Sequence, residues 1–112
     1  MPVVVDRFEL GPIGTNCYVV RSERGAAEAV VVDPSGDAAT IRLELAGMHA
    51  SCAAVLVTHS HWDHILGLAD LAEGTGAPVY GPEAETAVLE NPSDYFAGMG
   101  VSLRGWKPET SR

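Results

Sequence analysis

The sequence predicts an α/β fold, and three stretches support that prediction. Residues 53–57 are a short apolar run that leads into a polar loop, and an amphipathic run over residues 65–71 leaves it. This order is typical of a buried strand, a loop and a helix. Residues 30–32 are consecutive valines, as in a strand covered on both faces. Apolar residues over 38–48 repeat at helical spacing.

Three strands are expected before the first helix. Residues 3–10 begin with valines and then alternate, residues 16–21 are rich in β-favouring types, and residues 28–33 contain the valine run. Glycine and proline at residues 11–14 indicate a turn between the first two strands. Residues 22–26 are polar and form the loop of a second hairpin.

The first helix is predicted to run from an N-cap at Asp37 through Met48. One stripe of this helix is apolar and should face the core; its members are Ala38, Ile41, Leu45 and Met48. His49 follows without a partner at ligand spacing, so we interpret it as a cation near a helix C-terminus.

The second half of the chain continues the alternation. A strand over residues 53–57 is followed by a helix from Ile65 that ends near Gly74 and Gly76, and residues 78–80 form a short strand. A helix over residues 83–90 is expected, with its inward side chains at Ala84, Ala87 and Val88. Residues 92–112 have no clear period and are predicted to be an irregular tail, apart from an optional strand at 101–103.

The densest cluster of chemically active side chains is His59, His61, Asp63 and His64, within six consecutive residues. In extended chain His59 and His61 point the same way, and the turn at Asp63 and His64 allows two more ligands to converge nearby. Imidazole and carboxylate suit zinc, iron or manganese. The alternative is a histidine-rich helix entry that holds no ion.

These residues resemble a known family. The segment His59-Ser60-His61-Trp62-Asp63-His64 is similar to the HxHxDH signature of the metallo-β-lactamase superfamily. Residues 14–20, 30–36 and 75–81 resemble its glyoxalase II-like branch, the hydroxyacylglutathione hydrolases and their relatives. The resemblance extends from Phe8 to Glu90. It implies half of an αββα sandwich, a mixed sheet with helices on one face, with residues 1–112 as the amino-terminal part of the domain.

The resemblance also implies roles for individual residues. His59 and His61 would hold one metal ion, and Asp63 and His64 a second, with zinc expected first and iron or manganese as alternatives. Asp63 would also act as general base. Asp33, at the end of a strand, would orient the motif or a ligand histidine; otherwise it is a turn residue. The implied activity is hydrolysis of a small acyl substrate, foremost a thioester such as a hydroxyacyl-glutathione.

The chain departs from the family after His64. Members carry a further histidine, a bridging aspartate and a last histidine, whereas no histidine follows His64 here, and Asp70 and Asp94 lack the expected context. The chain is therefore the first half of a longer product, a natural truncation, or a subunit completed by another chain. The competing function is a non-catalytic half-domain that acts as an oligomerisation or interaction module, with weak or no metal binding. An uncovered sheet face would favour a homo-oligomer.

Composition limits the partners. The chain has 112 residues and a net charge of -8, which argues against nucleic acid and anionic membranes as partners. No apolar run approaches the ~20 residues that span a bilayer, and the first residues lack a signal-peptide pattern. Cys17 and Cys52 are expected to be reduced, buried thiols of a cytoplasmic protein rather than a disulfide.

Overall fold

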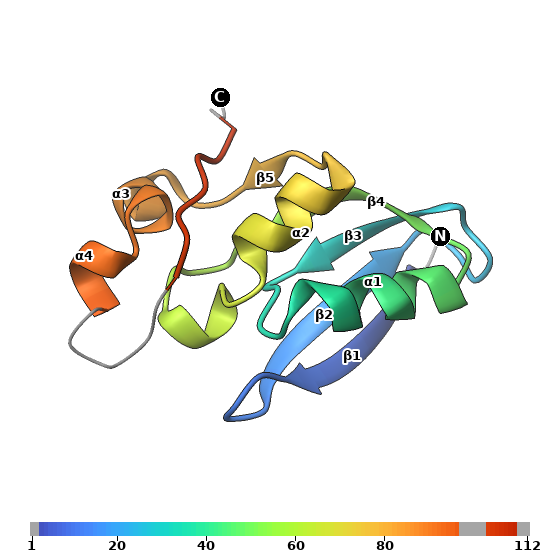
Figure 1. Cartoon of the computed structure of the whole chain (residues 1–112). Helices are drawn as coiled ribbons and strands as arrows, with labels where there is room; N and C mark the ends of the chain where they lie inside the picture. The colour runs from blue at the N-terminus through green and yellow to red at the C-terminus, as the bar shows by residue number, and fades with distance from the viewer. Residues whose placement is uncertain (1–2, 97–102, 110–112) are drawn as a thin grey trace.

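The fold is built on a five-stranded mixed sheet whose spatial strand order follows the chain order (Figure 1). The computed structural model describes residues 3–96 and 103–109. The strands are β1 (Val4–Leu10), β2 (Thr15–Arg21), β3 (Glu28–Val32), β4 (Ser51–Leu56) and β5 (Val79–Tyr80). The helices are α1 (Ala38–Gly47), α2 (Leu68–Thr75), α3 (Thr86–Glu90) and α4 (Ser93–Phe96), with 3-10 turns η1 (Trp62–His64) and η2 (Glu83–Glu85). The predicted α/β fold with a mixed sheet is confirmed.

The pairing of neighbouring strands changes from antiparallel to parallel at β3. β1, β2 and β3 are antiparallel neighbours, whereas β3, β4 and β5 run parallel. The β1–β2 turn contains Gly11 and Gly14, both at positive φ (79° and 68°), where a side chain would be strained. Helix α1 connects β3 to β4, and α2 connects β4 to β5. The carboxyl ends of the three parallel strands therefore meet at one edge, where α/β sheets place their binding sites.

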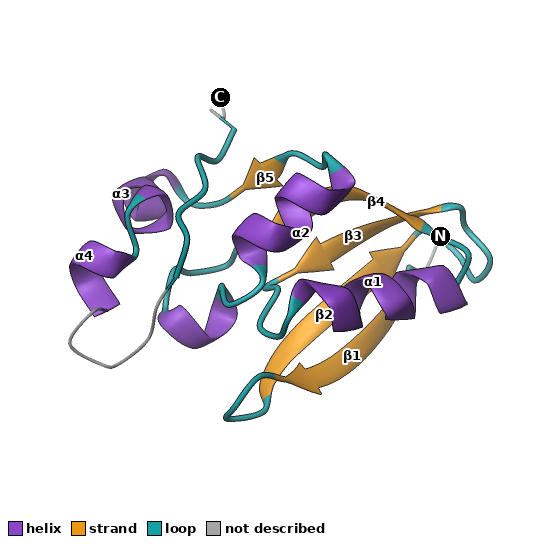
Figure 2. Cartoon of the chain, in the orientation of Figure 1, coloured by secondary structure: helices purple, strands orange, loops and turns teal. Residues whose placement is uncertain are grey.

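Helices α1 and α2 lie on the same face of the sheet (Figure 2). The Asp37 side chain accepts a hydrogen bond from the Thr40 N–H (2.8 Å), so the predicted N-cap of α1 is confirmed. The apolar stripe of α1 also packs inward as predicted. The core between sheet and helices includes Val19, Val31, Val55, Ile41, Leu45, Leu68 and Leu71.

The opposite face of the sheet is only partly covered. Tyr18, Val32, Leu56 and Tyr80 are paired in succession across four strands, and the last two are each 39% exposed. The prediction that the valine run is covered on both faces is wrong for the described residues. Val31 is fully buried under the helices, whereas Val32 on the other face is half-buried.

The helix that follows residues 59–64 begins later than predicted. The i→i+3 hydrogen bonds from His64 N–H to His61 O (2.9 Å) and from Ile65 N–H to Trp62 O (3.3 Å) form the tight turn η1. Helix α2 then begins at Leu68 and ends at Thr75, and Gly76 with a φ of 72° is the expected left-handed cap. Among the described residues, no helix combines the length and the apolar character that crossing a bilayer requires.

The predicted helix over residues 83–90 is divided into η2 and α3, and its inward face was predicted incorrectly. Leu89 is fully buried and Val88 is half-buried, whereas Ala84 and Ala87 are exposed. A leucine buries more apolar area than an alanine, so it sets the orientation of this short helix.

The carboxyl-terminal region is less irregular than predicted. Helix α4 forms within it, and residues 103–109 are not frayed, because the Trp106 N–H donates to Leu89 O (2.8 Å) and the Glu109 N–H to Val79 O (2.6 Å). The optional strand at 101–103 lies mostly outside the described residues, and Leu103 itself belongs to no strand.

Both cysteines are free thiols, as predicted. Cys17 is fully buried in β2, and burial raises the pKa of its thiol to about 11. Cys52 is half-buried, and burial raises its pKa as well. Neither thiol is therefore ionised at neutral pH.

Candidate metal centre

The predicted site lies at the edge of the sheet where β3 and β4 end. Asp33 directly follows β3, and residues 58–64 follow β4 after one residue. The two strands are parallel neighbours, and the Asp33 N–H continues their pairing by donating to Leu56 O (2.8 Å). The topology thus brings Asp33 beside a motif that is 25 to 31 residues away in sequence.

The Asp33 carboxylate connects the two ends of the motif loop. It is buried, and its Oδ1 accepts from the Thr58 N–H (2.7 Å) while Oδ2 accepts from the Thr58 hydroxyl (2.6 Å). His64 Nδ1 lies 3.0 Å from the same Oδ2. The backbone of Asp33 has φ 56°, a left-handed conformation that aspartate tolerates better than most residues. This geometry directs the carboxylate at both Thr58 and His64.

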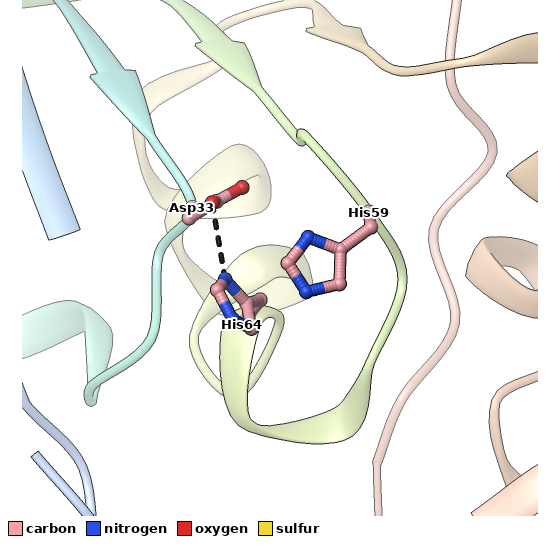
Figure 3. Close-up of side chains that lie close together, drawn as sticks. All are labelled: Asp33, His59 and His64. Carbon is pink, nitrogen blue, oxygen red and sulfur yellow. Dashed lines mark hydrogen bonds and ion pairs between the residues drawn. The ribbon is translucent and has the colours of Figure 1, made fainter. Parts of the chain in front are cut away.

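His59 and His64 face each other beside Asp33 (Figure 3). Their ring centroids are 3.9 Å apart, and one donor atom from each ring and from Asp33 all lie within 4.8 Å of one another. The hydrogen bonds assign the tautomers. Thr58 gives its hydroxyl proton to Asp33, so it accepts from His59 Nδ1 (3.1 Å), and His64 Nδ1 donates to Asp33. In the neutral form of each ring, Nε2 is then the nitrogen that is free to bind an ion.

His61 and Asp63 form a second group. His61 Nδ1 is 2.5 Å from Asp63 Oδ1, and Asp63 Oδ2 is 3.7 Å from His64 Nε2. The two side chains differ in exposure: 55% for His61 and 11% for Asp63. The structure thus places Asp33, His59 and His64 in one cluster, connects Asp63 to that cluster through His64, and leaves His61 on the solvent side.

Three hydrogen-bonding and charged neighbours keep Asp63 ionised. Burial alone would raise its pKa, but hydrogen bonds from His61 and Thr15 and the charge of His64 outweigh burial and lower the pKa below its ordinary value. The Thr15 hydroxyl donates to Asp63 Oδ2 at 2.6 Å. At neutral pH the site therefore offers an anionic oxygen beside imidazole nitrogens, a donor set suited to divalent cations.

Two contacts of this site were not predicted from the sequence. Thr15, at the start of β2, bonds Asp63, and Glu85, in η2, bonds Ser60 through both the Ser60 N–H (2.8 Å) and its hydroxyl (2.5 Å). Thr15 lies in a segment that carried the family resemblance, so a signal existed. Glu85 is one of several glutamates in its region, and nothing in the local pattern distinguishes it.

Comparison with known proteins places the chain in a family. The sequence model described as the metallo-beta-lactamase superfamily matches residues 10–111. An uncharacterised protein of Mycobacterium tuberculosis is 36% identical over 102 residues, which cover 90% of this chain and 44% of that protein. A hydroxyacylglutathione hydrolase of Halorhodospira halophila is 42% identical over 98 residues, covering 87% of this chain and 37% of the relative. The chain thus spans less than half the length of these curated relatives.

Solved structures agree with the sequence matches. The crystal structure of the B3 metallo-beta-lactamase BLEG-1 superposes with a TM-score of 0.82 at 30% identity, covering 97% of this chain and 54% of that one. The di-iron-bound form of TTHA1623 gives a TM-score of 0.74 at 26% identity, covering 96% and 52% of the two chains. The chain belongs to the metallo-β-lactamase superfamily.

Proposed function

We propose that this chain supplies the metal-binding part of a hydrolase that acts on a thioester or related acyl substrate of the hydroxyacyl-glutathione kind. The observation that carries the proposal is the convergence of His59, His64, Asp63 and Asp33 at the carboxyl edge of β3 and β4. The identity of 42% to a hydroxyacylglutathione hydrolase supports the substrate class. Residues 1–112 are proposed as the amino-terminal part of the domain, with further ligands supplied from outside this sequence.

In this proposal His59 and His61 hold one ion, and Asp63 and His64 hold a second. The distance between His64 Nε2 and Asp63 Oδ2, 3.7 Å, fits two ligands of one ion, because bonds of about 2.0–2.2 Å at tetrahedral angles separate ligand atoms by roughly 3.4 Å. Zinc is proposed first because it accepts imidazole and carboxylate ligands in this geometry. Iron is the main alternative, since the similar structure of TTHA1623 was determined in a di-iron-bound form.

Asp33 has two candidate roles, and its hydrogen bonds favour one. Its oxygens are near enough to His59 and His64 to share an ion with them. However, Oδ1 already accepts from the Thr58 N–H, and Oδ2 accepts from the Thr58 hydroxyl and faces His64 Nδ1. A carboxylate used in this way orients a ligand histidine and makes the opposite ring nitrogen more basic. We therefore propose that Asp33 positions His64 and does not bind the ion.

The chemistry is divided between the bound metal and the protein. When bound, the metal polarises the acyl carbonyl and makes water acidic enough to react near neutral pH. Asp33 and Thr58 fix the orientations of His64 and His59. Asp63 is proposed to take the proton of the attacking water as general base, although its lowered pKa makes it a weaker base and a better anionic ligand. The oxygen of that water would bond to the acyl carbon as the carbon–sulfur bond breaks, and Asp63 would pass the proton on to the departing thiolate.

A second candidate is a non-catalytic module that associates through the partly covered sheet face. The exposed Leu56 and Tyr80 on that face favour association with another copy. Four ligands divided between two ions also leave each ion two ligands short of tetrahedral closure, which would weaken binding. The free thiols of Cys17 and Cys52 fit a reducing compartment, and we propose the cytoplasm for either function.

Metal content and turnover distinguish the two candidates. Elemental analysis of the purified chain is paired with a thioester hydrolysis assay, for wild type, His61→Ala and the control His49→Ala. His49 is exposed and follows α1, outside the site. Stoichiometric metal with turnover that is lost in His61→Ala and kept in His49→Ala supports the hydrolase. A wild-type chain without metal and without turnover contradicts the hydrolase for this chain and leaves the interaction module.

A further inference from the structure

A carboxylate outside the motif holds the residue between its first two histidines. Ser60 is buried and lies between His59 and His61. Its N–H (2.8 Å) and its hydroxyl (2.5 Å) both donate to a single oxygen, Oε1 of Glu85. Glu85 belongs to η2, which is 25 residues further along the chain. Ser60 and Glu85 therefore form a tertiary contact.

This contact fixes backbone that has no regular structure. Residues 57–61 belong to neither a strand nor a helix. Thr58, near one end of this segment, is bonded to Asp33, and the peptide that joins His59 to Ser60 is held by Glu85. Two ligands separated by one residue can bind the same ion only if the backbone between them keeps its orientation. Because this backbone is already anchored, metal binding loses less conformational entropy than it would if the loop were free.

We propose that Glu85 is a positioning residue, which acts through Ser60 to keep His59 and His61 in the arrangement that one metal ion requires. The inference rests on the proposed function, because it assumes that these histidines bind metal. It extends that function to a residue outside the motif. The two hydrogen bonds from Ser60 lower the pKa of the Glu85 carboxyl.

The geometry separates the effect of the hydrogen bonds from the effect of the charge. Both bonds end on the same oxygen, so a glutamine at position 85 can accept both through its single carbonyl oxygen. Glu85→Gln therefore removes the charge and keeps the contact, whereas Glu85→Ala removes both. Ser60→Ala removes only the hydroxyl bond. Glu83→Ala is the matched control, because Glu83 lies in the same turn, is exposed, and has a side chain that forms no hydrogen bond or ion pair within the described residues.

The test measures the affinity of the full chain for Co²⁺ by its visible absorption, together with the amide hydrogen exchange of residues 58–61 in metal-free protein. Glu85→Ala is expected to weaken Co²⁺ binding by roughly 10- to 100-fold, the range for groups that orient metal ligands, and to speed exchange at Ser60. Ser60→Ala should lie between wild type and Glu85→Ala. Glu85→Gln and Glu83→Ala should match wild type in both measurements.

Three outcomes would contradict the inference in different ways. Wild-type affinity in Glu85→Ala overturns the role of Glu85 and leaves the proposed function intact. Equal losses in Glu85→Gln and Glu85→Ala, with circular dichroism showing that both are folded, would mean that charge and not positioning matters. A wild-type chain that binds no Co²⁺ overturns the proposed metal function itself.

Discussion

The two halves of the candidate site are held very differently. The inner cluster, formed by Asp33, Thr58, His59 and His64, is connected by hydrogen bonds between residues that follow two paired strands. The outer pair, His61 and Asp63, has its own mutual contact and one bond from Thr15. His64 is 21% exposed and His61 55%. The comparison indicates that the fold itself builds the inner cluster, whereas the position of His61 depends mainly on its loop.

Removal of the Asp33 carboxylate should give the largest loss of stability. Asp33→Ala leaves the Thr58 N–H, the Thr58 hydroxyl and His64 Nδ1 without their acceptor in a buried site. We expect a loss of about 3 kcal/mol in the free energy of unfolding, measured by urea denaturation. Asp94→Ala, at an exposed aspartate in α4, should change it by less than about 0.5 kcal/mol. Similar losses of unfolding free energy in the two variants would contradict the conclusion that the fold builds the inner cluster.

A methyl group at Gly67 should disturb the loop that carries Asp33. A Cβ at this position would lie 2.2 Å from the Gly36 carbonyl oxygen, and the Gly67 N–H donates to Pro34 O (2.9 Å). We expect Gly67→Ala to cost about 2 kcal/mol because backbone has to move. Gly74→Ala, in α2, meets only the flexible end of Arg42 and should be neutral or stabilising by up to about 1 kcal/mol. Thermal melts of the two variants check the contrast.

Loss of the Thr15 bond should have a smaller effect that depends on pH. Thr15→Val removes the donor to Asp63, and we expect a cost of about 1.5 kcal/mol at pH 7. The pKa of Asp63 is lowered in the folded chain, so its contribution to stability is present above the unfolded pKa and is lost as pH falls through the folded pKa. The difference between wild type and Thr15→Val should therefore shrink on acidification below about pH 4. Urea unfolding at a series of pH values measures it, and a difference that grows in acid would contradict the assignment.

The smallest effect on stability is expected at His61. Its side chain is the more exposed of the pair, so His61→Ala should cost less than about 1 kcal/mol. His64→Ala removes a partner of Asp33 and should cost more. Parallel urea titrations of the two metal-free variants rank them directly. A greater loss of unfolding free energy in His61→Ala than in His64→Ala would mean that the outer pair contributes more to stability than the inner cluster.

The sequence predicted the sheet and the grouping of the motif side chains better than the contacts that support them. Strands and α1 follow from local periodicity, and His59, His61, Asp63 and His64 lie together in the chain. Thr15 and Glu85 reach the site only through pairing and packing over 48 and 25 residues. Local sequence patterns cannot predict contacts between residues that are so far apart in the chain.

The errors in helix boundaries have a similar origin. The apolar period from Ile65 onward does not distinguish a helix from the i→i+3 turn that precedes α2. In α3 the period favoured the alanines, but burial of the larger Leu89 decided which face turned inward. In both places tertiary packing overrode the local pattern.

The spacing of the proposed ligands has a consequence for how added metal would affect the melting temperature. Four of its groups lie within six residues, so even a denatured chain presents a compact chelator. Asp33 joins them only after β3 and β4 have paired. A ligand that binds both native and denatured chains stabilises the native one only by the difference in affinity. Metal should therefore raise the melting temperature by less than its affinity for the native chain alone would give. The observed rise reports how much more tightly the folded chain binds metal than the denatured chain does.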